Sequence, residues 1–172
     1  MLAIGTGLRV VLCPVILSLL LNGARTAAAI AFFVAATTDW FDGRLARRWG
    51  VTTRLGALLD TTADKLLVTA ALIGLIAIRF ASPWVALVIL GREFTILGLR
   101  AASASAQVSF KTSMFGKWKA TVQFGAMTLA MLRPEVVIAG AYLDQWAMAI
   151  AAIITAWSGI DYMVRFSAAL RD

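Results

Sequence analysis

The chain has 172 residues, of which 61% are apolar and 15% are charged, and its mean hydropathy is +0.86. Soluble domains average about 45–50% apolar residues, so this composition excludes an ordinary soluble domain and indicates a protein of the lipid bilayer. The net charge of +7 comes with no histidine and a single cysteine, Cys13, so neither a zinc site nor an intrachain disulfide is expected.

Six apolar segments follow one another along the chain. A helix needs about 20 mostly apolar residues to cross a hydrocarbon core about 30 Å thick. The segments that approximately meet this requirement are residues 6–22, 24–41, 56–78, 83–106, 114–132 and 144–167. The connections are short, and the longest polar one is 42–55, so consecutive helices should run antiparallel. The sequence therefore predicts an all-α integral membrane protein, a single domain over residues 1–172 built as a six-transmembrane-helix bundle.

The basic residues gather at one end of this predicted bundle. The cations expected at that end are Arg44, Arg47, Arg48, Arg54, Arg100, Lys111, Lys117, Lys119, Arg165 and Arg171, whereas the alternate connections carry only Arg25, Arg79 and Arg133. Because cytoplasmic loops carry the excess of Lys and Arg, both termini and the 42–55 connection are predicted to be cytoplasmic. This placement accounts for the basic charge, and no nucleic acid partner is expected.

Four of the nine acidic residues are aspartates within 26 positions, Asp39, Asp42, Asp60 and Asp64. The members of each pair lie about one helical turn apart and share a helix face, and the 42–55 connection returns the second pair beside the first. Crowded carboxylates repel one another unless they protonate or bind cations, and an oxygen-only set suits Mg²⁺ or Mn²⁺. A pair of divalent ions is a known device for phosphoryl displacement. The alternative is that the aspartates only cap helices.

The aspartates belong to a longer pattern, D-x-x-D-G-x-x-A-R, eight residues, then G-x-x-x-D-x-x-x-D. It is filled by Asp39, Asp42, Gly43, Ala46, Arg47, Gly56, Asp60 and Asp64. This pattern resembles the signature of the CDP-alcohol phosphotransferase family. The resemblance implies an enzyme that displaces CMP from a CDP-linked lipid or alcohol by the hydroxyl of an acceptor, at a site at the cytoplasmic end of the bundle.

The resemblance also implies residue roles. Asp39, Asp42 and Asp60 would hold two Mg²⁺ or Mn²⁺ ions, and Asp64 would share a metal ion and act as the catalytic base. A carboxylate beside like charges has a raised proton affinity, which suits a base.

The CDP-binding residues implied by the resemblance are Thr6, Arg9, Gly43, Ala46, Arg47 and Gly56. Glycine and alanine leave room for the nucleotide, and the planar fork of Arg47 suits the diphosphate oxygens. Thr6 is also placed to cap the first helix.

Further stretches are similar to one branch of this family, the bacterial phosphatidylglycerophosphate synthases. They are "TGLRVVLCPVIL" (6–17), "TDWFDGRLARRWGVTTRLGALLDTTADKLL" (38–67), "GREFTILGLRAASA" (91–104) and "GKWKATVQ" (116–123). The resemblance implies transfer of the phosphatidyl group from CDP-diacylglycerol to sn-glycerol 3-phosphate. It also implies a homodimer in the inner (cytoplasmic) cell membrane.

A dianionic acceptor requires cations beyond Arg47, and the candidates are Arg92, Arg100, Lys117 and Lys119. Except for Arg92, which lies deeper in its span, these cations are also explained as interfacial residues that reach water and set the topology. Glu93 either pairs with another helix or contacts substrate. Lys65 either balances the acidic cluster or reaches a phosphate.

Two other functions remain open at this point. Another acceptor, such as inositol phosphate, serine or phosphatidylglycerol, would keep the same chemistry. A cation transporter is the alternative from another class, but it would spread polar residues through the membrane depth, whereas here the charges gather at one side.

Overall fold

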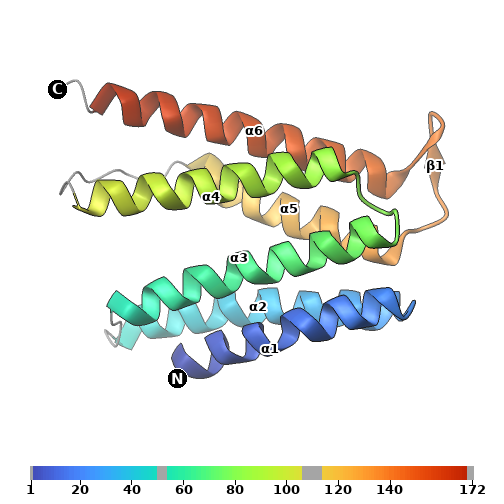
Figure 1. The fold of residues 1–172 in the computed structure, drawn as a ribbon, viewed down its shortest axis with the longest axis horizontal. Helices are drawn as coiled ribbons and strands as arrows, with labels where there is room; N and C mark the ends of the chain where they lie inside the picture. Colours follow the sequence, from blue (N-terminus) through green and yellow to red (C-terminus); the bar gives the residue numbers. More distant parts are fainter. Residues whose placement is uncertain (1, 50–53, 106–113, 170–172) are drawn as a thin grey trace.

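The computed structural model describes residues 2–49, 54–105 and 114–169. Over these ranges the chain forms six α-helices and one short β-hairpin. They are α1 (Leu2–Leu21), α2 (Arg25–Trp49), α3 (Arg54–Ala77), α4 (Pro83–Ser105), α5 (Met114–Leu132), β1 (Val137–Ile138), β2 (Ala141–Tyr142) and α6 (Leu143–Ala169). Consecutive helices run antiparallel, and both ends of the chain lie at the same end of the bundle (Figure 1). The predicted all-α, six-helix architecture is confirmed.

The helices form two groups of three (Figure 1). In the first group α1 packs against α2 and α3, and in the second α6 packs against α4 and α5. The groups are joined mainly through α2 and α5, where the rings of Phe32 and Phe124 lie 5.3 Å apart between centroids. By contrast, α3 makes few contacts with α4 and α5. The line along which α3 faces α4 and α5 is called the α3–α4/α5 seam below.

Two helix boundaries differ from the sequence prediction. Helix α2 continues through Trp49, although 42–55 was predicted as a polar connection, because Leu45, Ala46 and the arginines that follow are strong helix formers. The motif positions from Asp39 to Arg47 therefore all lie on one helix. Helix α1 already includes Leu2, so Thr6 lies inside the helix and the prediction that it caps the helix is wrong.

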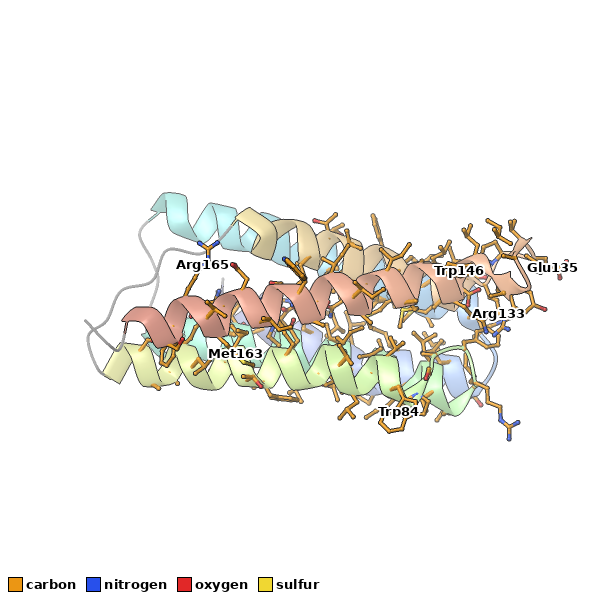
Figure 2. The ribbon with its side chains drawn as sticks, turned by 90° about the horizontal axis from the view of Figure 1, so that it is seen from above. Trp84, Arg133, Glu135, Trp146, Met163 and Arg165 are labelled. Atoms are coloured by element: carbon orange, nitrogen blue, oxygen red, sulfur yellow. The ribbon has the colours of Figure 1, made fainter. Side chains whose placement is uncertain are left out.

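The β-hairpin was not predicted. Val137 pairs with Tyr142, and Ile138 pairs with Ala141. Both turn residues have positive φ, 48° for Ala139 and 81° for Gly140, as a two-residue hairpin of the mirror-image turn type requires. Trp146 of α6 donates its indole N–H to the carbonyl oxygen of Ile138 at 2.9 Å and so holds the hairpin against the helix (Figure 2).

The end of the bundle opposite the termini carries Arg25 and Arg133. The guanidinium of Arg133 lies 4.0 Å from the ring centroid of Phe80 and 4.3 Å from that of Tyr142, and that of Arg25 lies 5.3 Å from Phe80. These cation–π contacts join the start of α2, the α3–α4 turn and the hairpin. Cys13, predicted to be an ordinary packed residue, is half-buried against the core.

Length and apolar composition identify one helix of the described chain, over Leu143–Ser167, as long enough to cross a membrane. Gly5–Leu21 and Arg25–Thr38 are shorter apolar helices. Helices α3 and α4 carry charged residues along their length, among them Asp60, Asp64 and Arg92, which lowers their hydropathy. Because this test identifies one spanning helix, the six membrane crossings stay a prediction.

The contact between α1 and α3 depends on Gly74. A Cβ atom at this position would lie 2.5 Å from Cδ1 of Leu20, which is fully buried. We expect Gly74→Ala to destabilise the fold by about 1–3 kcal/mol, because the buried side chain of Leu20 must shift to make room for the added methyl group. Gly125→Ala is the matched control, since a Cβ there meets nothing within 4 Å, and its higher helix propensity should stabilise α5 by up to about 1 kcal/mol. Thermal unfolding of both variants in detergent tests this, and equal shifts would contradict the close packing.

Candidate active site at the start of helix α3

Asp60 is held by helix α1. Nη1 of Arg9 donates to Oδ1 of Asp60 at 2.8 Å, and Oγ1 of Thr6 donates to the same oxygen at 3.4 Å. The Arg9 side chain is 2% exposed and that of Asp60 is 31% exposed. A buried guanidinium must be paired, so this contact fixes the rotamer of Asp60 and the register of α1 on α3. The two predicted CDP-binding residues of α1, Thr6 and Arg9, are thus hydrogen-bonded to Asp60, a predicted metal ligand.

Asp64 lies one turn further along α3, on the same face as Asp60. Its side chain is 28% exposed, and its Oδ2 atom lies 4.0 Å from Nζ of Lys65. Both carboxylates are thus partly accessible and one helical turn apart, an arrangement that suits a divalent cation bound by hard oxygen ligands.

Four predicted site residues of the motif, Asp39, Asp42, Gly43 and Arg47, lie on α2 in the part of the chain whose side chains are not described. The same holds for Ala46, and for Lys117 on α5. Among the side chains that are described, no group of three or more His, Cys, Asp or Glu residues gathers. Gly56 lies in the first turn of α3 and is half-buried.

Glu93 of α4 is the centre of a second polar cluster. One carboxylate oxygen accepts a hydrogen bond from Nζ of Lys65 on α3, and the other accepts one from Nζ of Lys119 on α5. Nη1 of Arg92 lies 3.4 Å from the same oxygen as Lys119. Glu93 and Lys119 are 3% and 5% exposed. The structure shows that Glu93 pairs with other helices. Lys119, predicted to bind the acceptor's phosphate or to lie at the membrane interface, is buried and paired with Glu93.

Arg92 is anchored on α6. Its Nη2 atom donates to Oγ of Ser158 at 3.0 Å, and Gly159 leaves the room for its side chain, since a Cβ there would lie 2.9 Å from Cγ of Arg92. Arg100, two turns further along α4, is exposed, and its positive charge lies near enough to repel those of Arg92 and Lys65.

Sequence reasoning missed Ser158 and Gly159, because a small polar residue and a glycine in an apolar helix carry no signal of their own. Glu93 did carry a signal, an acidic residue in the middle of an apolar segment. A cavity of about 530 Å³ lies elsewhere, between the α3–α4 turn and α6 at the opposite end, where Arg79 and Gln145 line it.

Comparison with known proteins identifies the class to which this fold and site belong. The chain matches the CDP-alcohol phosphatidyltransferase family over residues 3–157. The chain belongs to the CDP-alcohol phosphatidyltransferase family, which confirms the family resemblance of the aspartate motif.

Individual relatives are similar to the chain over most of their length. The chain is 38% identical to the CDP-diacylglycerol–glycerol-3-phosphate 3-phosphatidyltransferases of Escherichia coli strain K12 and Shigella flexneri serotype 5b, over 95% of this chain and 93% of each relative. It is 41% identical to the protein of the same name from Sodalis glossinidius, over 81% of this chain and 78% of the relative.

The Arg9–Asp60 pair gives a direct test of the geometry. We expect Arg9→Met to lower the stability by about 2 kcal/mol, less than for a fully buried pair because Asp60 is partly exposed. This corresponds to a fall of about 4–8 °C in the apparent Tm for a chain of this size. Arg165→Met is the control, since its exposed pair with Asp161 should contribute less than about 1 kcal/mol. A Tm for Arg9→Met equal to that of the control would contradict the pairing.

Proposed function

We propose that this chain transfers the phosphatidyl group of CDP-diacylglycerol to sn-glycerol 3-phosphate and releases CMP, a step of phosphatidylglycerol and cardiolipin biosynthesis. The observation that carries the proposal is the similarity, over nearly their whole length, to relatives named for this reaction. The motif supports the displacement of CMP, since every position of the family pattern from Asp39 to Asp64 is filled.

The proposed setting is the inner cell membrane, crossed six times with both termini in the cytoplasm. Arg133 lies at the end of the bundle opposite Arg165 (Figure 2), which supports this orientation. Large exposed apolar side chains on α4 and α6 support contact with lipid, and examples are Trp84 at 76% and Trp157 at 71% exposure. A homodimer remains part of the proposal through the family resemblance.

Asp39, Asp42, Asp60 and Asp64 would hold two Mg²⁺ or Mn²⁺ ions. When bound, these ions supply the positive charge that neutralises the diphosphate and the leaving CMP. Asp60 and Asp64 fit this role because they are hard oxygen donors on one helix face and are partly accessible.

The residues of the chain would act as follows. Asp64 takes the proton of the acceptor's primary hydroxyl, and that oxygen bonds to the phosphorus bearing the diacylglycerol. The bond between this phosphorus and the bridging oxygen of CMP breaks, and Arg47 stabilises the departing phosphate. Arg9 and Thr6 keep Asp60 in place. Gly43, Ala46 and Gly56 would leave room for the nucleotide.

Release of CMP by the purified protein, with CDP-diacylglycerol, Mg²⁺ and one acceptor at a time, tests the function. We expect release with glycerol 3-phosphate and at least about 1,000-fold less with Asp60→Asn, because a metal ligand of the site is lost. Asp161→Asn, at a partly exposed aspartate of α6, is the matched control and should keep wild-type turnover. Release only with inositol phosphate would refute the acceptor assignment, and full activity of Asp60→Asn would remove Asp60 from the metal site.

Arg100 is proposed to bind the phosphate of glycerol 3-phosphate, together with Arg92 and Lys117. Arg100→Ala should raise the acceptor KM about tenfold and the donor KM less than about threefold, because a charge-assisted bond to the phosphate is lost. The exposed Arg165 of α6 provides the control variant Arg165→Ala. An unchanged acceptor KM would assign Arg100 to the membrane interface.

A further inference from the structure

The α3–α4/α5 seam is bridged by one carboxylate. Helix α3 makes few contacts with α4 and α5, yet Glu93 of α4 binds Lys65 of α3 with one oxygen and Lys119 of α5 with the other. Because its two carboxylate oxygens bind cations on two different helices, Glu93 joins α3, α4 and α5 at one level of the bundle. The same carboxylate lies 3.4 Å from Nη1 of Arg92, which is anchored through Ser158 on α6.

The burial of this cluster makes Glu93 necessary for the cations around it. With Glu93 at 3% and Lys119 at 5% exposure, removing the negative charge would leave a buried ammonium without its partner. Lys65 is less buried, at 21%, and would be free to move toward the aspartates. The arrangement therefore depends on the charge of Glu93 and not only on its volume.

The cluster is connected to the proposed site on both sides. Lys65 directly follows Asp64, and its Nζ atom lies 4.0 Å from Oδ2 of Asp64 while it is bonded to Glu93. On the other side Arg92 is held between Glu93 and Ser158, where the like charge of Arg100 repels it. The cations outnumber Glu93, so the cluster retains positive charge that favours an anion beside Asp64.

We propose that Glu93 is a positioning residue for the acceptor: it binds Lys65 and Lys119 and lies beside Arg92, and it thereby orients Arg92 as a cation that receives the acceptor's phosphate. Lys119 then acts through Glu93 and does not touch the phosphate. This inference rests on the proposed function for the identity of the acceptor, but the ionic link itself does not.

The experiment is a double-mutant cycle with Glu93→Gln, Lys119→Met and the combined variant. We expect Glu93→Gln to raise the KM for glycerol 3-phosphate at least tenfold and the KM for CDP-diacylglycerol less than threefold. Lys119→Met should raise the acceptor KM by a smaller factor, because Lys65 and Arg92 still bind Glu93. The combined variant should match Glu93→Gln within twofold. Glu135→Gln, at the other glutamate of the chain, is exposed at the opposite end of the bundle (Figure 2) and should match the wild type.

Two results would overturn the proposal. If the effects of Glu93→Gln and Lys119→Met on the acceptor KM multiply, Lys119 contacts the phosphate directly. If Glu93→Gln changes kcat or the donor KM while the acceptor KM stays within twofold, Glu93 does not orient Arg92 for the acceptor.

The apparent Tm of the same four variants is measured without substrate. The proposal expects non-additive losses for Glu93 and Lys119, and additive losses would overturn the ionic link even in a variant too unstable to assay. Suppose that the wild-type protein is inactive with glycerol 3-phosphate while the mutant cycle still shows non-additive Tm losses. This result would refute the proposed acceptor and with it the acceptor role of Glu93, but it would confirm the ionic link between the helices.

Discussion

The pairing of buried ionic groups is the constraint on which the site depends. A guanidinium or ammonium group removed from water must be paired with a carboxylate to be stable. The described helices meet this requirement in two places. On α1, Arg9 is paired with Asp60, and on α5, Lys119 is paired with Glu93. Each pair joins different helices, so the charges that the fold must satisfy also determine which residues lie beside Asp64.

The two pairs divide the site into two sides. Arg9 and Thr6 hold the metal-ligand candidate Asp60 from the first group of helices, where α1 packs closely on α3. Glu93, Lys119 and Arg92 belong to the second group, and among the described side chains they reach α3 through Lys65. A donor bound near the aspartates and an anionic acceptor bound near the arginines would thus meet at Asp64, between the groups. The sparse contact of α3 with α4 and α5 is consistent with this, because the ion pairs of Glu93 bridge the seam beside Asp64.

Much of the fold was predictable, since six apolar segments with short connections leave few arrangements, and the family pattern rests on fixed spacings of Asp, Gly and Arg. The extension of α2 past Asp42 was not predicted, because Gly43 and the arginines resemble a connection although the residues after Gly43 favour a helix. The partners of Arg9, Lys65 and Lys119 were also beyond sequence reasoning, because they lie on other helices, and a hydropathy pattern does not give the rotation of one helix against another. The role of Gly159, which leaves room for the side chain of Arg92, could be seen only from the position of Arg92 in the fold.

Binding of Mn²⁺ tests most directly whether the aspartates form a two-metal site. Electron paramagnetic resonance of the protein titrated with Mn²⁺ distinguishes isolated ions from pairs, because two ions bridged by carboxylates at about 3.5–4 Å are magnetically coupled. The account predicts two ions per chain with a coupled spectrum, which Asp60→Asn reduces to an uncoupled one. A single uncoupled ion in the wild-type protein, or none, would contradict it.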